Sequence, residues 1–151
     1  MNKNTEELEC NPIKAIASTG QNKGQYGLSG YCDPVIVSKD WGHELIYQNT
    51  DLYCLKQLYL KPQSSCSFHL HMEKHETLLV AKGILYIDTT HNKIKKTYIV
   101  CPGEAFVVAP GFIHSLRSED EEVYLIESST PSYDTDSIRI AEGYKTKKEK
   151  Q

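Results

Sequence analysis

The sequence predicts an all-β protein, a double-sheet jelly roll or small barrel, on three observations. From Pro34 onward, short runs dense in Val, Ile, Leu and Tyr follow one another, as is typical of strands. Turn residues separate these runs, because Gly and Asn supply positive φ angles and Pro presets the first turn position. Through the middle of the chain no long segment keeps a helical stripe of apolar residues. Two packed sheets or a closed barrel would let so many short strands protect their edges.

The expected strands are taken in order from the apolar runs between the turns. They comprise residues 35–37, 43–48, 53–60, 66–71, 77–81, 84–89, 97–100, 105–108, 113–117 and 123–128. The clearest turns between them are Lys82-Gly83, Pro102-Gly103 and Pro110-Gly111. Their regular, close spacing leaves no room for the crossover helices of a parallel sheet.

One domain is expected from the length and composition. A chain of 151 residues with 39% hydrophobic residues lines one core. We assign residues 34–144 to this domain, residues 1–33 to a polar, glycine-rich arm that could add one strand, and residues 145–151 to a charged tail.

Charge and cysteine usage narrow the partners and the compartment. Seventeen basic and twenty acidic residues give a formal net charge of −3, which argues against nucleic acid as a partner. Five cysteines without a CxxC pair favour free thiols in a reducing compartment. The first thirty residues contain no apolar run long enough for a signal peptide or a membrane span. We therefore expect a cytoplasmic protein that does not associate with membranes.

Four residues form a candidate metal-binding set. His69 and His71 are two residues apart, so in a strand both rings point to the same face. Glu76 opens the next expected strand, and His114 follows the Pro110-Gly111 turn. Without a cation, three buried imidazoles and a carboxylate would carry a large desolvation cost. Three histidines and one carboxylate suit a divalent ion such as Zn, Mn, Fe, Co or Ni.

The spacing of these residues resembles the two cupin motifs. The pattern His69-x-His71-x4-Glu76-x6-Gly83 is similar to the first motif, and Gly103 followed by Pro110-Gly111-x2-His114 is similar to the second. This resemblance implies the double-stranded β-helix, the jelly-roll barrel of cupins, with the same four side chains as metal ligands.

A closer resemblance covers residues 37–144. The segments 39–42, 55–62, 67–76, 127–133 and 136–139 resemble the type II mannose-6-phosphate isomerase cupin module, here without the guanylyltransferase part that often precedes it. The resemblance implies metal-assisted proton transfer between an aldose and a ketose phosphate. Lys56, Lys74 and Arg139 are the candidates to receive the substrate phosphate, and no catalytic base is identifiable.

Two other functions stay open from sequence. One is a non-catalytic cupin that binds a small molecule or sugar, and the other is an Fe(II)-dependent dioxygenase with the same ligands. Whichever of these functions holds, we expect a homodimer, because small open β-sandwiches with apolar edge strands commonly bury them against a second copy.

Several other side chains are assigned structural or surface positions. Trp41 is expected to pack at one end of the barrel, and His75 to lie around the ligands or at the surface. Cys54, Cys66 and Cys101 are expected to be small buried hydrophobic residues.

Overall fold

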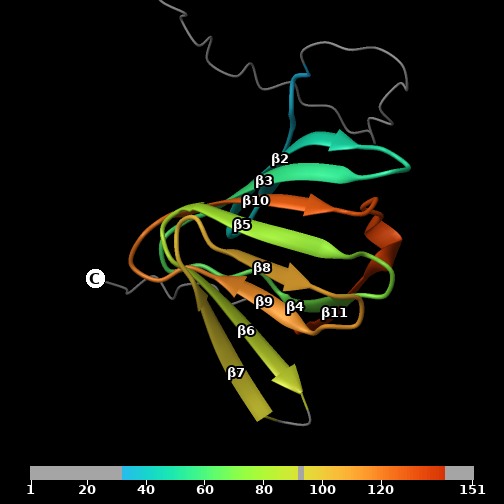
Figure 1. Cartoon of the computed structure of the whole chain (residues 1–151). Coiled ribbons are helices and arrows are strands. Elements are labelled where there is room, and N and C mark those ends of the chain that lie inside the picture. Colours follow the sequence, from blue (N-terminus) through green and yellow to red (C-terminus); the bar gives the residue numbers. More distant parts are fainter. Residues whose placement is uncertain (1–31, 92–93, 142–151) are drawn as a thin grey trace, which may run out of the picture.

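The computed structural model describes residues 32–91 and 94–141, which form two antiparallel sheets (Figure 1). The elements are β1 (Val35–Lys39), β2 (Gly42–Asn49), β3 (Cys54–Leu60), β4 (Phe68–His71), β5 (Glu76–Lys82), β6 (Leu85–His91), β7 (Ile94–Val100), β8 (Ala105–Val108), β9 (His114–Arg117), β10 (Val123–Ser129), the 3-10 helix η1 (Asp134–Asp136) and β11 (Ser137–Ala141). The all-β jelly-roll prediction is confirmed.

The two sheets are built from strands that are distant in sequence. One sheet has the order β1-β2-β3-β10-β5-β8, and the other has the order β11-β4-β9-β6-β7. Neighbours within each sheet pair antiparallel. Strands β6 and β7 form a long hairpin that extends away from the rest of the barrel (Figure 1). After β3, each strand except β7 lies in the opposite sheet to the strand before it, which brings β4, β5, β9 and β10 around one interior.

The core follows from the period-2 alternation of the strands. In β3 and β10 every second residue is buried, including Leu58 and Leu60 on β3 and Val123 and Leu125 on β10. These side chains pack with Leu78, Val80, Leu85, Ile87, Val100, Val108 and Leu116 in one core cluster. Trp41 is half-buried and packs against this cluster, in agreement with its expected packing role.

The same alternation places polar residues of β3 and β10 on the inner face. Lys56 continues the buried row of β3, and Glu127 continues the buried row of β10. Apolar side chains fill one part of the interior, and charged side chains gather in the other part. This polar part holds the candidate site.

Gly83 makes the turn between β5 and β6 possible. Its φ is +78°, and a Cβ built there would lie 2.2 Å from the carbonyl oxygen of Glu122. Glycine is the residue that adopts this conformation without strain. The turn lets β6 leave the first sheet and enter the second.

All ten expected strands exist, with ends that differ by a few residues. The sequence interpretation missed β11 and η1, and it placed Cys101 in the interior, whereas Cys101 is exposed. Cys54 and Cys66 are buried as expected. Most of the expected arm, residues 1–31, and the tail, residues 145–151, lie outside the described residues, so the domain limits stay predictions. No helix within the described part of the chain is long and apolar enough to cross a bilayer.

The expected homodimer also stays a prediction, and the sheet edges give it a physical basis. The edge strands β7 and β8 carry exposed Ile99 and Val107, which are 60% and 55% accessible. Burying such edges against a second copy would remove unpaired strand groups from water. Sedimentation at about tens of micromolar, a concentration that populates micromolar dimers, should give twice the chain mass. A monomer under these conditions would contradict the prediction.

Candidate metal centre

A cavity of about 520 Å³ lies between the sheets, and its lining is largely polar. Side chains from both sheets contribute to it, among them His69 on β4, Glu76 on β5 and Glu127 on β10. Such a volume is suited to a small molecule.

Three histidines meet at the wall of this cavity. His69 and His71 lie on β4 with Leu70 between them, and His114 begins β9 directly opposite His69 in the sheet. One ring nitrogen from each of the three residues lies within 4.8 Å of the others. This arrangement could hold a metal ion, as the His-x-His spacing predicts.

Backbone carbonyls fix the tautomers of two of these rings. His69 Nδ1 lies 2.8 Å from the carbonyl oxygen of Ser67, and His114 Nδ1 lies 2.9 Å from that of Phe112. A carbonyl oxygen only accepts hydrogen bonds, so each Nδ1 carries the proton in the neutral ring. Each Nε2 then keeps a lone pair, which is the form that binds a metal.

Burial keeps the rings of His71 and His114 neutral. Burial, followed by the effects of the neighbouring Lys74 and His69, lowers the pKa of His71 to about 4. Burial, followed by the effect of His69, also lowers the pKa of His114 to about 4. Both rings are therefore neutral near pH 7, as metal ligands must be.

Glu76 brings a carboxylate to the three rings. Its Oε2 lies 3.6 Å from His114 Nε2 and its Oε1 lies 3.8 Å from His71 Nε2. Lys74 Nζ lies 2.5 Å from Oε1, whereas the buried Oε2 has no hydrogen-bond donor among the described residues. A buried oxygen without a donor is costly, and a cation between Oε2 and the rings would satisfy it. This donor set fits a divalent metal.

A network of buried lysines and carboxylates extends from Glu76 along the lining of the cavity. Lys74 Nζ also lies 2.5 Å from Glu127 Oε1, and Lys56 Nζ lies 4.0 Å from the same oxygen and 3.4 Å from Glu44 Oε2. Lys74 and Glu127 are only 3% and 4% exposed. Each ammonium group therefore lies between two carboxylates.

The pKa values in this network favour the charged forms. Burial raises the pKa of Glu127, but attraction to Lys56 and Lys74 outweighs it and lowers the pKa to about 2. For both lysines burial lowers the pKa, and attraction to Glu127 and to a second carboxylate raises it overall. Glu127 thus stays ionised and both lysines stay protonated near pH 7.

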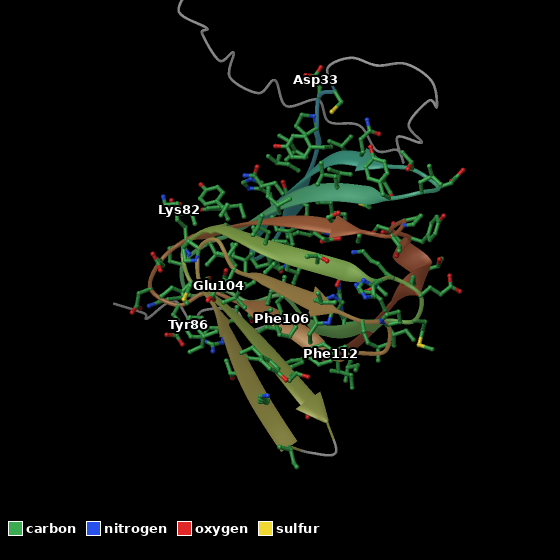
Figure 2. All side chains as sticks on the ribbon, viewed as in Figure 1. Asp33, Lys82, Tyr86, Glu104, Phe106 and Phe112 are labelled. Atoms are coloured by element: carbon green, nitrogen blue, oxygen red, sulfur yellow. The ribbon has the colours of Figure 1, made fainter. Side chains whose placement is uncertain are left out.

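Aromatic rings connect the β6–β7 hairpin with the histidine His114. Phe106 and Phe112 lie close together beside the hairpin (Figure 2), with ring centres 6.0 Å apart. Tyr98 on β7 packs against Phe106 in a tilted arrangement with ring centres 4.9 Å apart, and Phe112 stacks with His114 at 6.2 Å. A line of aromatic contacts thus runs from the hairpin to His114, which is 1% exposed.

The structure brings the four predicted ligands together, whereas the three predicted phosphate-binding residues differ in their exposure and pairing. His75 is exposed and is not among the residues that line the cavity. Lys56 and Lys74 are buried and paired with carboxylates, whereas Arg139 on β11 is exposed at the cavity. The ligand and substrate roles of these residues stay predictions.

Two residues that the sequence reasoning missed contribute to the site. Glu127 could have been found, because it continues the inward-facing row of Val123 and Leu125. Asp136 lies in η1, and its carboxylate approaches the ligand strand from a segment without a periodic signal.

Comparison with known families identifies the fold family. The family model described as Cupin matches residues 41–144. The chain belongs to the cupin family. Similar cupins with assigned activities include a D-lyxose ketol-isomerase from Thermofilum sp. (strain ex4484_79), which is 28% identical over 147 residues and covers 82% of this chain and 81% of the relative. A D-lyxose/D-mannose isomerase from Thermosediminibacter oceani is 26% identical over 117 residues, covering 62% of this chain and 65% of the relative.

Solved structures show the same cupin fold. CapF, the capsular polysaccharide assembling protein from Staphylococcus aureus, has a TM-score of 0.62 at 20% identity, covering 72% of this chain. Oxalate decarboxylase from Bacillus subtilis has a TM-score of 0.65 at 12% identity, covering 76% of this chain. This cupin spans about a third of either protein, 34% and 33%. The predicted likeness to sugar isomerases is confirmed, whereas mannose-6-phosphate specificity stays a prediction.

Proposed function

We propose that this cupin is a metal-dependent aldose–ketose isomerase whose substrate is a small unphosphorylated sugar. The observation that carries the proposal is the position of the Glu76 carboxylate. One of its oxygens lies near the His71 ring, the other lies near the His114 ring, and the first also contacts the ammonium group of Lys74. A metal site and a fixed positive charge thus border the same cavity. The isomerase names of the D-lyxose and D-mannose relatives support this reaction class.

His69, His71, His114 and Glu76 would hold the metal. The first three would offer Nε2 lone pairs, and Glu76 would offer Oε2, to which none of the residues in the described ranges donates a hydrogen bond. When bound, a divalent first-row metal supplies a Lewis acid that polarises the carbonyl and hydroxyl oxygens of an open-chain sugar.

Lys74 would stabilise the charge that develops as a proton leaves the second carbon of the sugar. Its ammonium group has three N–H donors, and two of them point to Glu76 and Glu127 at 2.5 Å. The third can donate to a sugar oxygen at the cavity. Because the pKa of Lys74 is raised overall by its carboxylate neighbours against the effect of burial, this donor stays charged. A fixed, buried donor of this kind lowers the barrier without reorganisation.

The charge balance of the cavity favours a neutral sugar over a sugar phosphate. Lys56 and Lys74 are already paired with Glu44, Glu76 and Glu127. A phosphate placed beside them would have to compete with these carboxylates and would be repelled by them. The other cations that line the cavity, the lysines, form ion pairs with carboxylates, whereas among the described residues Arg139 forms none and is exposed. Phosphate recognition would therefore depend on Arg139.

Hydrogen exchange tests the proposed reaction directly. Metal-loaded protein in deuterated water should incorporate deuterium at the second carbon of D-lyxose or D-mannose, and NMR would follow it. Exchange reports proton removal even when net conversion is slow. Lys74→Met should slow this exchange more than Lys82→Met, which removes an exposed ammonium group from the pair with Glu122.

The controls separate the competing functions. Faster exchange with mannose 6-phosphate than with mannose, lost in Arg139→Ala, would contradict the neutral-sugar proposal and support the phosphate alternative. Sugar binding by calorimetry without exchange would indicate a binding protein. Oxygen consumption with Fe(II), in place of exchange, would indicate a dioxygenase.

A further inference from the structure

His71 differs from the other two histidines in what its second ring nitrogen faces. His69 and His114 each direct Nδ1 to a backbone carbonyl at hydrogen-bond distance. His71 Nδ1 is buried and has no hydrogen-bond partner among the described residues. The Oδ2 atom of Asp136 lies 3.6 Å from it. A small rotation of the ring or carboxylate would close this distance to a hydrogen bond.

Asp136 is held in place by the loop that carries the ligands. Its Oδ1 accepts hydrogen bonds from the backbone N–H groups of Met72 and Glu73, and its Oδ2 accepts one from that of Lys74, all at 3.0 Å. Helix η1 thus clamps the turn between β4 and β5 and aims a carboxylate at His71. The clamp brings together segments that are far apart in the chain.

The neutral His71 ring carries one N–H proton, which can lie on Nε2 or on Nδ1, and a different carboxylate faces each nitrogen. A proton on Nε2 would face Glu76 Oε1 at 3.8 Å, but that oxygen already receives the Lys74 ammonium at 2.5 Å. A proton on Nδ1 would face Asp136 Oδ2, which receives one neutral backbone N–H in the structure. The Asp136 oxygen therefore has the greater remaining capacity to accept a hydrogen bond.

We propose that Asp136 is a positioning residue for the metal: it holds the proton of His71 on Nδ1 and so leaves the Nε2 lone pair for the ion. This inference rests on the proposed metal site and does not depend on the reaction catalysed. Backbone carbonyls do the same for His69 and His114, so the third ligand alone depends on a side chain. That side chain comes from the C-terminal segment.

The wild-type protein without metal gives the first test. Long-range nitrogen–proton NMR correlations of the imidazole rings, recorded near pH 7, should show the Nδ1–H form for His71. The measurement needs neither metal nor substrate. A His71 ring in the Nε2–H form would overturn the proposal.

Asp136→Asn gives the second test. Its amide oxygen can keep the hydrogen bonds from Met72 and Glu73, while its NH₂ group takes the place of Oδ2 and donates to His71 Nδ1. His71 should then shift to the Nε2–H form, with the other two ligand histidines unchanged. The metal dissociation constant, from competition with a chelator, should rise about 10- to 100-fold, the usual effect of losing such a partner.

Thr130→Val is the matched control. Thr130 holds the same loop through its hydroxyl, which accepts a hydrogen bond from the backbone N–H of His75 at 3.1 Å, whereas the group that faces His71 Nδ1 is the carboxylate of Asp136. This variant should loosen the loop yet leave the His71 tautomer unchanged. If Asp136→Asn keeps the Nδ1–H form and the wild-type metal affinity, or if Thr130→Val shifts the tautomer equally, the positioning role is wrong. Failure to exchange the hydrogen of any sugar would instead count against the proposed reaction only.

Discussion

His114→Ala is expected to release most of the bound divalent metal and to weaken metal binding more than about 100-fold. Changes around a ligand already cost about 10- to 100-fold in affinity, and loss of a ligand costs more. His114 is 1% exposed, so water cannot easily replace the missing nitrogen. Elemental analysis of protein purified without added metal should show close to one ion per chain in the wild type. Glu76→Ala and His71→Ala should also lose most of this ion.

His75→Ala provides the control for this experiment. His75 is adjacent to Glu76 in sequence but exposed and away from the cavity, so its metal content should equal that of the wild type. Unchanged metal content in both His114→Ala and Glu76→Ala would show that the ion binds elsewhere. Loss of metal in all variants alike would point to a general effect on folding.

Lys74→Met is expected to lower the free energy of unfolding of the metal-free protein by about 3–5 kcal/mol, the usual cost of breaking a buried ion pair on one side. The substitution keeps the length and apolar contacts of the side chain. It leaves Glu76 and Glu127 as neighbouring buried anions without the ammonium group between them. Urea denaturation at neutral pH would measure the loss. Divalent metal should restore part of it, since a cation at Glu76 replaces the missing charge.

Lys82→Met is the matched control for Lys74→Met. Lys82 forms a similarly short pair with Glu122, at 2.7 Å, but on the exposed surface. Exposed pairs contribute little, so the denaturation midpoint should hardly change. Equal midpoints for both variants would show that the buried network does not stabilise the fold.

Sequence periodicity predicted the barrel well, because the central strands β3, β5 and β10 alternate between buried and more exposed residues. Strand β8 was predicted at residues 105–108, and the structure has it at Ala105–Val108. Strand β11 was missed, because it lies at a sheet edge and its Ile138 and Ile140 are about half exposed. An edge strand of this kind depends on pairing with β4, a contact between distant parts of the chain that no local pattern indicates.

The spacing of the two motifs predicted the ligand set. His69, His71 and Glu76 follow from positions on consecutive strands, and His114 follows from the Pro110-Gly111 turn. The structure places all four together. The contact between Lys74 and Glu127 was not predictable in the same way, since Glu127 comes from the distant strand β10. Lys74 itself lies in a turn, where a lysine is normally exposed. Its burial results from closure of the whole barrel, which the local sequence does not encode.

A metal ion bound between β4 and β9 would also stabilise the pairing of these two strands. These strands share a single paired position, His69 opposite His114, and both residues are candidate ligands. An ion held by the two rings would act as a cross-link between the two neighbouring strands with the fewest paired positions in this sheet, much as a disulfide ties distant parts of a chain. Strand β11, which hydrogen-bonds to the far side of β4, would be tethered through the same point. Chelation would then weaken the edge of the sheet that carries Arg139 before it weakens the apolar core.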